Sequence, residues 1–317
     1  MSKTKPFTQK IDDADRDPHC EPRLVREALK FRAQKGDLVL HSFPKSGTHW
    51  VLYIVQLILK KGQPITSHGA FTQNVVHLGV TDPDDLQPSL PLRLFQSHFP
   101  IRKELINSEA KYIYVTRNPW DVCVSLYHMV TSLSAYRFQD GTFDDFFDAF
   151  LSEDVAGYGN YFNHVVSGYE VKDMNNVFFV TYENLTRDTR GTVLKLARFL
   201  GEGYAMDLEE DERLLRDLLE RCSADQMRHV LVADLSPISN PRIEKVLWHL
   251  DEISKNEYKS KKYCYVRDAK VGGWKRYFSQ EQLKRLEEAI KEVEKKSPVM
   301  ELWGNIRKEA TEMSAGK

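Results

Sequence analysis

The sequence has no excess of charge of either sign and no low-complexity segment. Its 317 residues hold 45 Lys and Arg against 46 Asp and Glu, a formal net charge of -1. A nucleic-acid coat or a polybasic membrane protein needs a basic excess, so neither partner is expected, although a local basic pocket is compatible with this balance. The 16 Gly and 13 Pro form no linker, which excludes a fibrous or low-complexity class.

Long apolar runs and paired cysteines are also missing. The longest apolar stretch, Trp50–Leu59, is interrupted by Gln56 and is far shorter than the roughly 20 residues that a membrane crossing needs. Residues 1–17 are polar, so no signal peptide is visible. The four cysteines lie far apart without a C-x-x-C pair, which favours free thiols in a reducing compartment over a disulfide framework or a zinc site. We therefore expect a cytoplasmic protein without a metal site.

What the sequence does contain is an alternation of strand-like and helix-like segments. Such alternation builds βαβ units around a mostly parallel sheet, with ligands at the carboxyl ends of its strands. The prediction is an α/β fold, a single domain with a mostly parallel central sheet flanked by helices. The expected strands are 37–43, 91–97, 111–116 and 176–181, and the expected helices are 48–60, 120–130, 192–200, 209–221 and 280–296.

The turn between the first strand and the first helix, residues 43–50, carries the strongest functional signal. It presents backbone N–H groups at a helix N-terminus, where phosphate binds, and Lys45 adds a cation and Thr48 a hydroxyl. The alternative is an ordinary helix cap with a solvated lysine. The turn is not a Walker A loop, because Lys45 precedes Gly47 by two positions, and strand 111–116 does not end in an aspartate that would hold magnesium. A P-loop-like turn for a group transferred without a metal fits better.

A second turn repeats this logic after strand 111–116. Arg117 follows that strand directly, and Ser125 lies eight residues later on the next helix. Together they could hold a phosphate group. The alternative is an Arg117–Asp121 ion pair with a surface serine. Two such turns suggest a ligand with two separated phosphate-type groups.

These segments resemble, in order and spacing, the motifs of the cytosolic sulfotransferase family. Segment 45–50 is similar to its 5′-phosphosulfate loop Tyr-Pro-Lys-Ser-Gly-Thr-Thr-Trp, and Arg117 with Ser125 matches its 3′-phosphate element. Segment 182–184 resembles its Tyr-Glu-Asp/Asn segment. The C-terminal signature Arg-Lys-Gly-x-x-Gly-x-Trp-Lys is matched by Arg267, Gly272, Trp274 and Lys275. The resemblance extends over roughly residues 35 to 290.

The resemblance implies sulfuryl transfer from 3′-phosphoadenosine 5′-phosphosulfate (PAPS) to a hydroxyl or amine of a small aromatic or hydrophobic acceptor. The product would be adenosine 3′,5′-bisphosphate (PAP), with no metal involved. It also implies that Lys45 stabilises charge on the leaving phosphate oxygen, where a positioned cation is most effective. The implied catalytic residues are His98, Lys45 and Ser125, and the implied donor-binding residues are Lys45, Ser46, Gly47, Thr48, His49, Trp50, Arg117, Ser125, Tyr182, Cys222, Arg267, Asp268 and Ala269.

The proton of the acceptor needs a general base, and the resemblance points to one of the ten histidines. His98 lies in Gln-Ser-His-Phe-Pro, which is similar to the family's Lys-Thr-His-Leu-Pro segment. The ordinary pKa of a histidine, near 6.5, suits a base at neutral pH. For His41, His128 and His164 we expect structural roles.

Several positions depart from the family pattern. His49 replaces a threonine of the loop, Cys222 a threonine contact, and Ala224 an adenine-stacking phenylalanine. Asp268 places a carboxylate near the 3′-phosphate, and we expect it to point away into water because an uncompensated inward carboxylate is costly. Gln96 replaces a lysine two residues before the base. The C-terminal dimer motif is not intact, so either a monomer or a dimer is compatible with the sequence.

The expected division of the chain is an N-terminal segment 1–30, partly flexible, a sulfotransferase domain 31–300 and a C-terminal tail 301–317. Segments 63–91 and 235–264 are expected to cover the acceptor site. Two rival functions remain open: a P-loop kinase, disfavoured by the missing magnesium aspartate, and a catalytically silent binder of adenosine bisphosphate, suggested by Ala224 and Asp268.

Overall fold

The centre of the molecule is a parallel five-stranded sheet. The structure is a computed structural model that describes residues 5–85, 89–235 and 262–316. The strand order is β4-β5-β3-β6-β7, and every neighbouring pair is parallel. This confirms the predicted α/β fold. The strands are β3 (Asp37–His41), β4 (Val75–His77), β5 (Arg93–Ser97), β6 (Lys111–Thr116) and β7 (Val177–Thr181).

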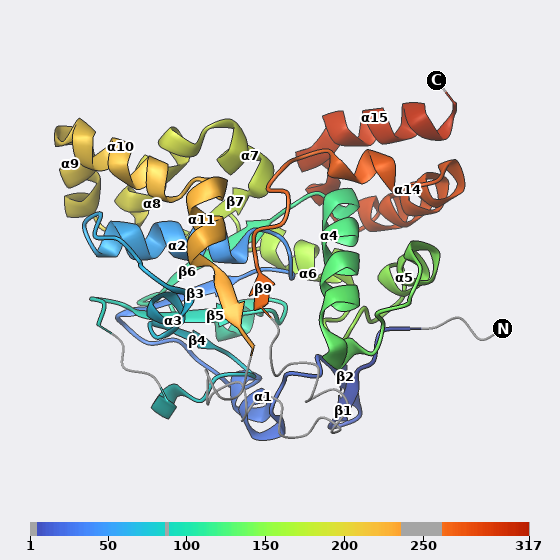
Figure 1. The fold of residues 1–317 in the computed structure, drawn as a ribbon, viewed down its shortest axis with the longest axis horizontal. Coiled ribbons are helices and arrows are strands. Elements are labelled where there is room, and N and C mark those ends of the chain that lie inside the picture. Colours follow the sequence, from blue (N-terminus) through green and yellow to red (C-terminus); the bar gives the residue numbers. More distant parts are fainter. Residues whose placement is uncertain (1–4, 86–88, 236–261, 317) are drawn as a thin grey trace.

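Helices cover this sheet, and in the view of Figure 1 most of them are drawn above it or to its right. A β-hairpin precedes the first helix, and a short antiparallel pair, β8 with β9, crosses the front of the molecule. The helices are α1 (Pro22–Ala28), α2 (Thr48–Leu59), α3 (His68–Thr72), α4 (Pro119–Ser132), α5 (Phe143–Phe150), α6 (Tyr161–Tyr169), α7 (Tyr182–Arg187), α8 (Thr189–Leu200), α9 (Glu202–Glu210), α10 (Glu212–Arg221), α11 (Ala224–Val230), α14 (Gln280–Glu294) and α15 (Gly304–Ser314), and the remaining strands are β1 (Gln9–Ile11), β2 (Ala14–Arg16), β8 (Val232–Asp234) and β9 (Lys262–Cys264).

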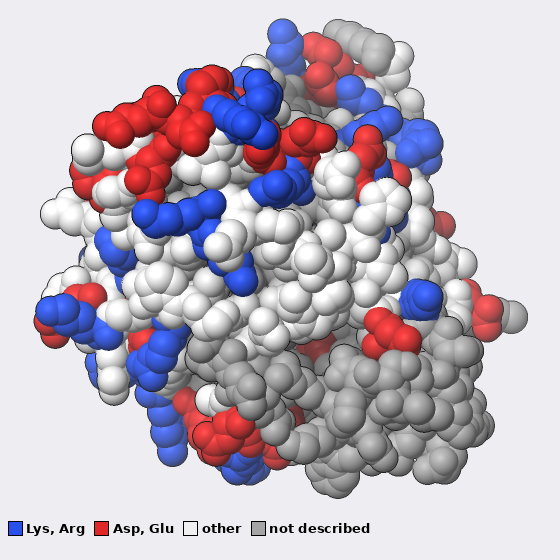
Figure 2. Space-filling view, turned by 60° about the vertical axis from the view of Figure 1, so that its left-hand side comes forward, with Lys and Arg blue, Asp and Glu red and all other residues white. Residues whose placement is uncertain are grey.

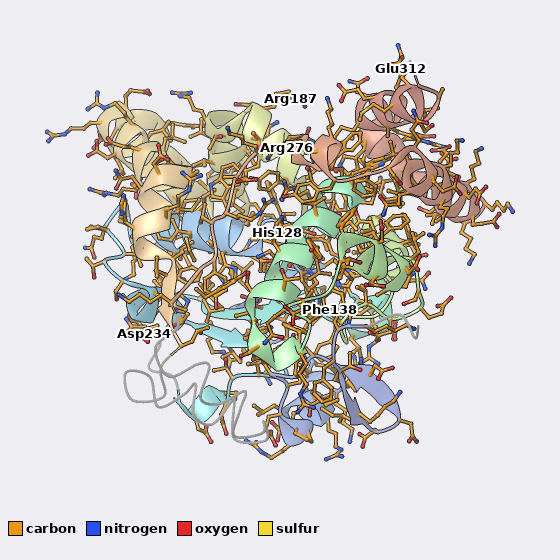
Figure 3. The ribbon with its side chains drawn as sticks, turned by 45° about the vertical axis from the view of Figure 1, so that its right-hand side comes forward. His128, Phe138, Arg187, Asp234, Arg276 and Glu312 are labelled. Atoms are coloured by element: carbon orange, nitrogen blue, oxygen red, sulfur yellow. The ribbon has the colours of Figure 1, made fainter. Side chains whose placement is uncertain are left out.

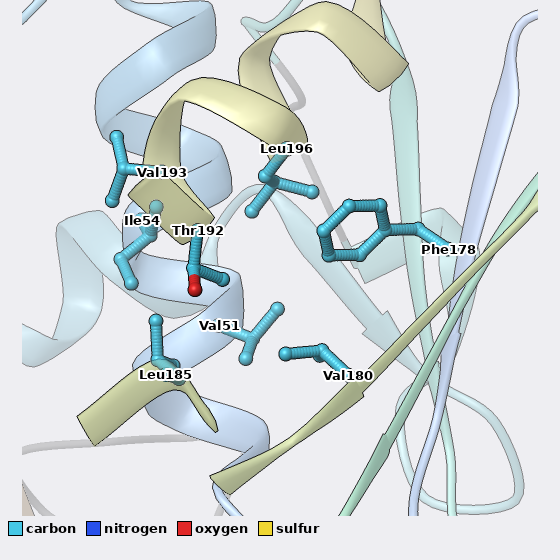
Figure 4. A pocket seen from close by; sticks show the side chains of 8 residues that line it. All are labelled: Val51, Ile54, Phe178, Val180, Leu185, Thr192, Val193 and Leu196. Carbon is cyan, nitrogen blue, oxygen red and sulfur yellow. The ribbon is translucent and has the colours of Figure 1, made fainter. Parts of the chain in front are cut away.

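The alternation of side chains along β3 divides the core between the two faces of the sheet. Leu38 and Leu40 pack with α2, α8 and α10, whereas Val39 packs on the opposite face. Helix α2 is apolar on nearly all sides because it is enclosed between the sheet and other helices. Figure 4 shows a small gap in this packing, lined by Val51, Ile54 and six further side chains, of which only Thr192 carries a polar atom. A gap this apolar is part of the core and holds no candidate site.

One predicted helix is two helices in the structure. The amphipathic pattern of residues 209–221 predicted a continuous helix, but α9 ends at Glu210 and α10 begins at Glu212. Between them the Asp211 side chain accepts the N–H groups of Arg213 and Leu214 and so caps α10. Aspartate at this position competes with the helical backbone, which explains the break.

Both ends of the chain are packed in the described structure. Residues 304–314 form α15, which packs on α14, and Trp303 before it is buried, with its indole N–H bonded to Glu183. Near the N-terminus the hairpin is followed by the buried Asp17. Both terminal segments thus contain buried residues, and the division of the chain at residues 30 and 300 stays a prediction.

The surface agrees with the balanced charge of the sequence. On the face shown in Figure 2, acidic and basic side chains are interspersed over the upper part, with a broad uncharged area below them. Within the described ranges, no helix combines the length and apolar content of a membrane span.

Candidate active site

The strand-to-helix turn after β3 has the backbone of an anion-binding loop. Lys45 and Gly47 both adopt positive φ angles, 68° and 110°, and Gly47 is the N-cap of α2. A Cβ added to Gly47 would lie 3.0 Å from Cδ2 of Tyr182, so the close approach of the ring also requires glycine. The Thr48 and Ser42 hydroxyls lie 2.7 Å apart. Successive N–H groups at a helix N-terminus favour phosphate.

Two buried polar atoms at the predicted phosphate sites have no hydrogen-bond partner among the residues that the structure describes. These are Oγ of Ser46, in the first turn, and Nε of Arg117, after β6. Buried polar groups are normally satisfied, and leaving one unpaired costs about 1–3 kcal/mol. Arg117 lines the cavity described below, so its unpaired N–H is a suitable partner for a phosphate oxygen of a ligand, whereas Ser46 does not line that cavity. The loop N–H groups and Arg117 are thus the groups that fit a nucleotide with two anionic groups.

Lys45 is held inside the site by an aromatic residue from a distant part of the chain. Its Nζ donates to the hydroxyl of Tyr263 at 3.2 Å and lies 5.7 Å from the centre of that ring. Burial, together with the charges of Arg267 and Arg117, lowers the pKa of Lys45 to about 8. A bound anion would favour the charged form again.

Arg117 makes several contacts at once. Its guanidinium lies 4.3 Å from the centre of the Tyr182 ring, and Nη2 donates to the Lys270 carbonyl at 2.7 Å. Nη2 is also 3.5 Å from the Asp121 carboxylate, so the predicted alternative of an ion pair is present in this structure. The Asp121 carboxylate in turn accepts the N–H groups of Gly272 and Trp274. Asp121 thereby fastens the C-terminal loop to the start of α4.

His98 has the hydrogen bonds expected of a base. Its Nδ1 lies 2.8 Å from the Ser42 carbonyl, which can only accept, so Nδ1 carries the proton and Nε2 keeps the lone pair. The amide nitrogen of Gln96 lies 3.1 Å from Nε2 and donates to it. Burial lowers the pKa of His98, and the Ser42 carbonyl and the Asp17 charge oppose this shift.

One cavity of about 930 Å³ joins these groups. It brings together the residues of both predicted turns, the proposed base and the C-terminal segment. Two predicted residues do not line it: Ser46 lies beneath the loop, and Cys222 is buried with its thiol directed to the Leu219 carbonyl. The predicted residues that line the cavity are Lys45, Gly47, Thr48, His49, Trp50, His98, Arg117, Ser125, Tyr182, Arg267, Asp268 and Ala269.

Residues 35–298 match the sequence model of the sulfotransferase domain, over most of the chain and over both phosphate-type turns. The chain belongs to the sulfotransferase family. The predicted enzyme class, a PAPS-dependent sulfotransferase, is thereby confirmed.

The relatives are enzymes of the same family. The amine sulfotransferase of Oryctolagus cuniculus is 29% identical over 290 residues, which cover 89% of this chain and 88% of the relative. The 3-alpha-hydroxysteroid sulfotransferase of Cavia porcellus is 29% identical over 284 residues, covering 86% and 88%. The structure of mouse sulfotransferase SULT7A1 complexed with PAP shares the fold, with a TM-score of 0.65, 21% identity and coverage of 98% of this chain and 99% of that one.

The sulfotransferase loop is modified by an aromatic stack. Two histidine rings stack on the ring of Tyr265. The ring centres of His49 and Tyr265 lie 4.1 Å apart, and those of His68 and Tyr265 lie 5.2 Å apart at an interplanar angle of 9°. Burial, followed by the charges of His68 and Lys45, holds the pKa of His49 well below its usual value. A neutral imidazole packed against an aromatic ring thus occupies the position of the family's threonine.

The other histidines singled out in the sequence have structural contacts. Nε2 of His128, on α4 in Figure 3, lies 2.7 Å from the Tyr277 hydroxyl. Nδ1 of His41 lies 3.2 Å from the Phe99 carbonyl, and Nδ1 of His164 lies 2.7 Å from the Tyr114 hydroxyl. None of the three lines the described cavity.

Some cavity residues were missed by the sequence analysis. Tyr263 and Tyr265 reach the loop from β9 and the residue that follows it, although more than two hundred positions separate them from Lys45. Ser223 and Met227 also line the cavity, together with Ala224, which the sequence analysis had placed at the family's adenine-stacking position; the nearby Trp50 indole N–H donates to the Cys222 carbonyl at 2.9 Å. The expected cover 63–91 contributes cavity residues, whereas most of 235–264 lies outside the described residues.

The Asp268 carboxylate is compensated by neighbouring cations. It lies 2.7 Å from Nη1 of Arg267 and 4.0 Å from Nη2 of Arg276, and it is partly exposed. This arrangement differs from a carboxylate that simply points into water, because Asp268 is paired with Arg267.

Replacement Asp268→Asn is therefore expected to tighten PAP binding. Loss of the carboxylate frees Arg267, and one charge at short range in a partly solvated site is worth about 1 kcal/mol, or about fivefold in affinity. Isothermal titration at low and high salt measures this, since screening erodes the effect. Glu309→Gln, which removes the partner of Lys275, is the matched control. An affinity equal to wild type at every ionic strength would contradict the expected competition.

Proposed function

We propose that the chain transfers the sulfuryl group of PAPS to a hydroxyl or amine of a small hydrophobic acceptor, with His98 as general base and Lys45 at the leaving oxygen. The observation that carries this proposal is the shared cavity: His98, whose Nε2 keeps its lone pair and accepts from the Gln96 amide, and the buried Lys45 line the same space. Apolar and aromatic side chains, including Phe71, Leu133 and Tyr136, line its acceptor end.

The residues of the chain divide the work of the reaction. The loop at residues 45–50, with Arg117, Ser125 and Arg267, would hold the phosphate groups of PAPS, and Trp50 and Tyr182 would lie near its adenine. When bound, PAPS supplies a sulfuryl group on a good leaving group. The Nε2 atom of His98 takes the proton of the acceptor hydroxyl as its oxygen bonds to sulfur, and Lys45 stabilises the electron pair left on the phosphate oxygen.

The proposal is tested by offering labelled PAPS to a panel of phenols, alcohols, sterols and amines, with and without EDTA. We expect label on at least one acceptor class and no loss of rate with EDTA. Activity that EDTA abolishes and magnesium restores would favour the kinase alternative. Tight PAP binding without transfer to any acceptor would favour the silent binder.

The lowered pKa of Lys45 predicts a pH dependence of PAP binding. Below pH 8 Lys45 is already charged, and binding needs no proton at this group. Above pH 8 the free lysine is neutral, so binding takes up a proton and the affinity falls, by up to about tenfold per pH unit. Titration calorimetry in buffers of different ionisation enthalpy measures this uptake.

The matched variant is Lys45→Arg, because a guanidinium stays charged over this range. We expect no proton uptake by this variant between pH 8 and 9. Equal uptake by wild type and variant would show that another group titrates.

The four cysteines are unpaired in the described structure, three of them buried and Cys264 exposed. This pattern supports the predicted cytoplasmic location, which remains a proposal.

A further inference from the structure

The N-terminal segment, which precedes the match to the sulfotransferase domain, supplies a buried carboxylate to the cavity. Asp17 follows the β1–β2 hairpin, which lies below the lower end of α4 in Figure 1. Asp17 is 4% exposed and lines the same cavity as His98. A carboxylate kept from water is costly unless it is hydrogen-bonded or paired, so its partners indicate its role.

Within the described residues, the partners of the Asp17 carboxylate all line the cavity. Its Oδ1 accepts the backbone N–H of His19 at 2.6 Å and lies 2.9 Å from Nδ1 of that residue. Its Oδ2 accepts the hydroxyl protons of Tyr136 and Tyr158. Burial raises the pKa of Asp17, but His19 and the two tyrosine hydroxyls outweigh it, so the pKa lies below its usual value and the group is charged.

One of these tyrosines connects Asp17 to the proposed base. The Tyr158 ring packs edge-on against the ring of His98, with a centroid distance of 5.8 Å and an interplanar angle of 84°. By accepting the Tyr158 hydroxyl, the carboxylate also holds in place the ring against which the His98 imidazole packs. The Asp17 charge also raises the pKa of His98, against the effect of burial.

Asp17 and Lys45 are the charged groups among the side chains that act on His98. The others are neutral at physiological pH, because burial lowers the pKa of each histidine and raises that of Tyr158. Lys45 opposes a positive charge on His98, so Asp17 is the group that favours it. The neutral titratable neighbours of His98 are His41, His49, His77, Tyr158 and His164.

We propose that Asp17 is a positioning residue of the active site. Through Tyr158 it fixes the orientation of His98, and its charge stabilises the imidazolium that His98 becomes when its Nε2 takes the acceptor proton. The inference rests on the proposed role of His98 as base. It assigns a catalytic contribution to a part of the chain outside the matched domain.

The test uses Asp17→Asn in the full chain, with Asp15→Asn as the control, since Asp15 lies on the same hairpin and pairs with the exposed Lys10. Histidine NMR gives the titration midpoint of His98, whose resonance is identified by its absence from His98→Ala. We expect Asp17→Asn to move this midpoint to lower pH and to lower turnover of 2-naphthol about tenfold, with PAP affinity within twofold of wild type. A midpoint and rate equal to those of Asp15→Asn would overturn the proposal.

Tyr158→Phe tests the positioning step and is independent of the folding of Asp17→Asn. It keeps the ring but removes the hydroxyl, and we expect turnover to fall about threefold with an unchanged PAP affinity and a somewhat lower unfolding temperature, because the buried Asp17 loses one hydrogen bond. The double variant should lose less than the product of the two single losses, because both act through one contact. A wild-type rate for Tyr158→Phe, or independent losses in the double variant, would contradict the proposal. The NMR midpoint distinguishes this failure from that of the proposed function, because it needs no turnover.

Discussion

His98→Ala is expected to lower turnover about a hundredfold or more while PAP affinity remains nearly unchanged. In the proposed mechanism its Nε2 takes the acceptor proton, and Nε2 keeps its lone pair because the Ser42 carbonyl fixes the ring proton on Nδ1. The imidazole lies at the acceptor end of the cavity, so its loss removes proton transfer and leaves the phosphate sites intact. Single-turnover kinetics with saturating PAPS, together with PAP titration, separate these two effects.

The control for this variant is His229→Ala, an exposed histidine on α11. Turnover by His98→Ala within a fewfold of this control would remove His98 from the mechanism. A large loss of PAP affinity in His98→Ala would instead indicate that the imidazole supports the donor site.

Lys45→Ala is expected to lower turnover about a hundred- to a thousandfold. A buried cation at the leaving oxygen acts where charge develops, and removing one such group has an effect of this size in enzymes that stabilise an oxyanion. Lys45→Arg keeps the charge but places it differently, so we expect a smaller but still large loss. Rapid-quench measurement of the transfer step compares both variants with wild type.

Lys60→Ala, at the opposite end of α2, is the matched control for the loss of a lysine. An alanine variant at position 45 that transfers the sulfuryl group as fast as this control would contradict the assignment of Lys45.

Local patterns of the sequence were sufficient to predict four of the five strands of the central sheet, β3, β5, β6 and β7, and the two turns that bring Lys45 and Arg117 to the cavity. The three-residue strand β4 was not predicted, because so short a segment carries little periodic pattern. The turn after β3 can be recognised from its own residues, because Gly47 allows a positive φ angle and the helical pattern that begins at Thr48 marks the N-terminus of α2. The break at Asp211 escaped prediction, since the amphipathic period continues on both sides of the cap. Short-range patterns of this kind say little about where a helix is interrupted.

The contacts between distant segments could not be predicted in this way. Nothing near Lys45 in the sequence indicates that its ammonium donates to the hydroxyl of Tyr263, and nothing near Asp17 indicates that its carboxylate accepts from the hydroxyl of Tyr158. Cys222 was assigned to the donor site by its place in a motif, but the direction of its side chain depends on the packing of α10 and α11. Such contacts depend on how segments that are distant in the sequence pack together in the folded domain.

Sulfuryl transfer by these residues is tested most directly by letting two donors compete for one acceptor. Wild-type protein receives ³⁵S-labelled PAPS and γ-³²P-labelled ATP with magnesium at equal concentrations, together with the best acceptor of the panel, and the label in the product is counted. The account predicts ³⁵S alone in the product, at a rate that EDTA does not change and that His98→Ala lowers about a hundredfold. Incorporation of ³²P, or of neither label, would contradict it.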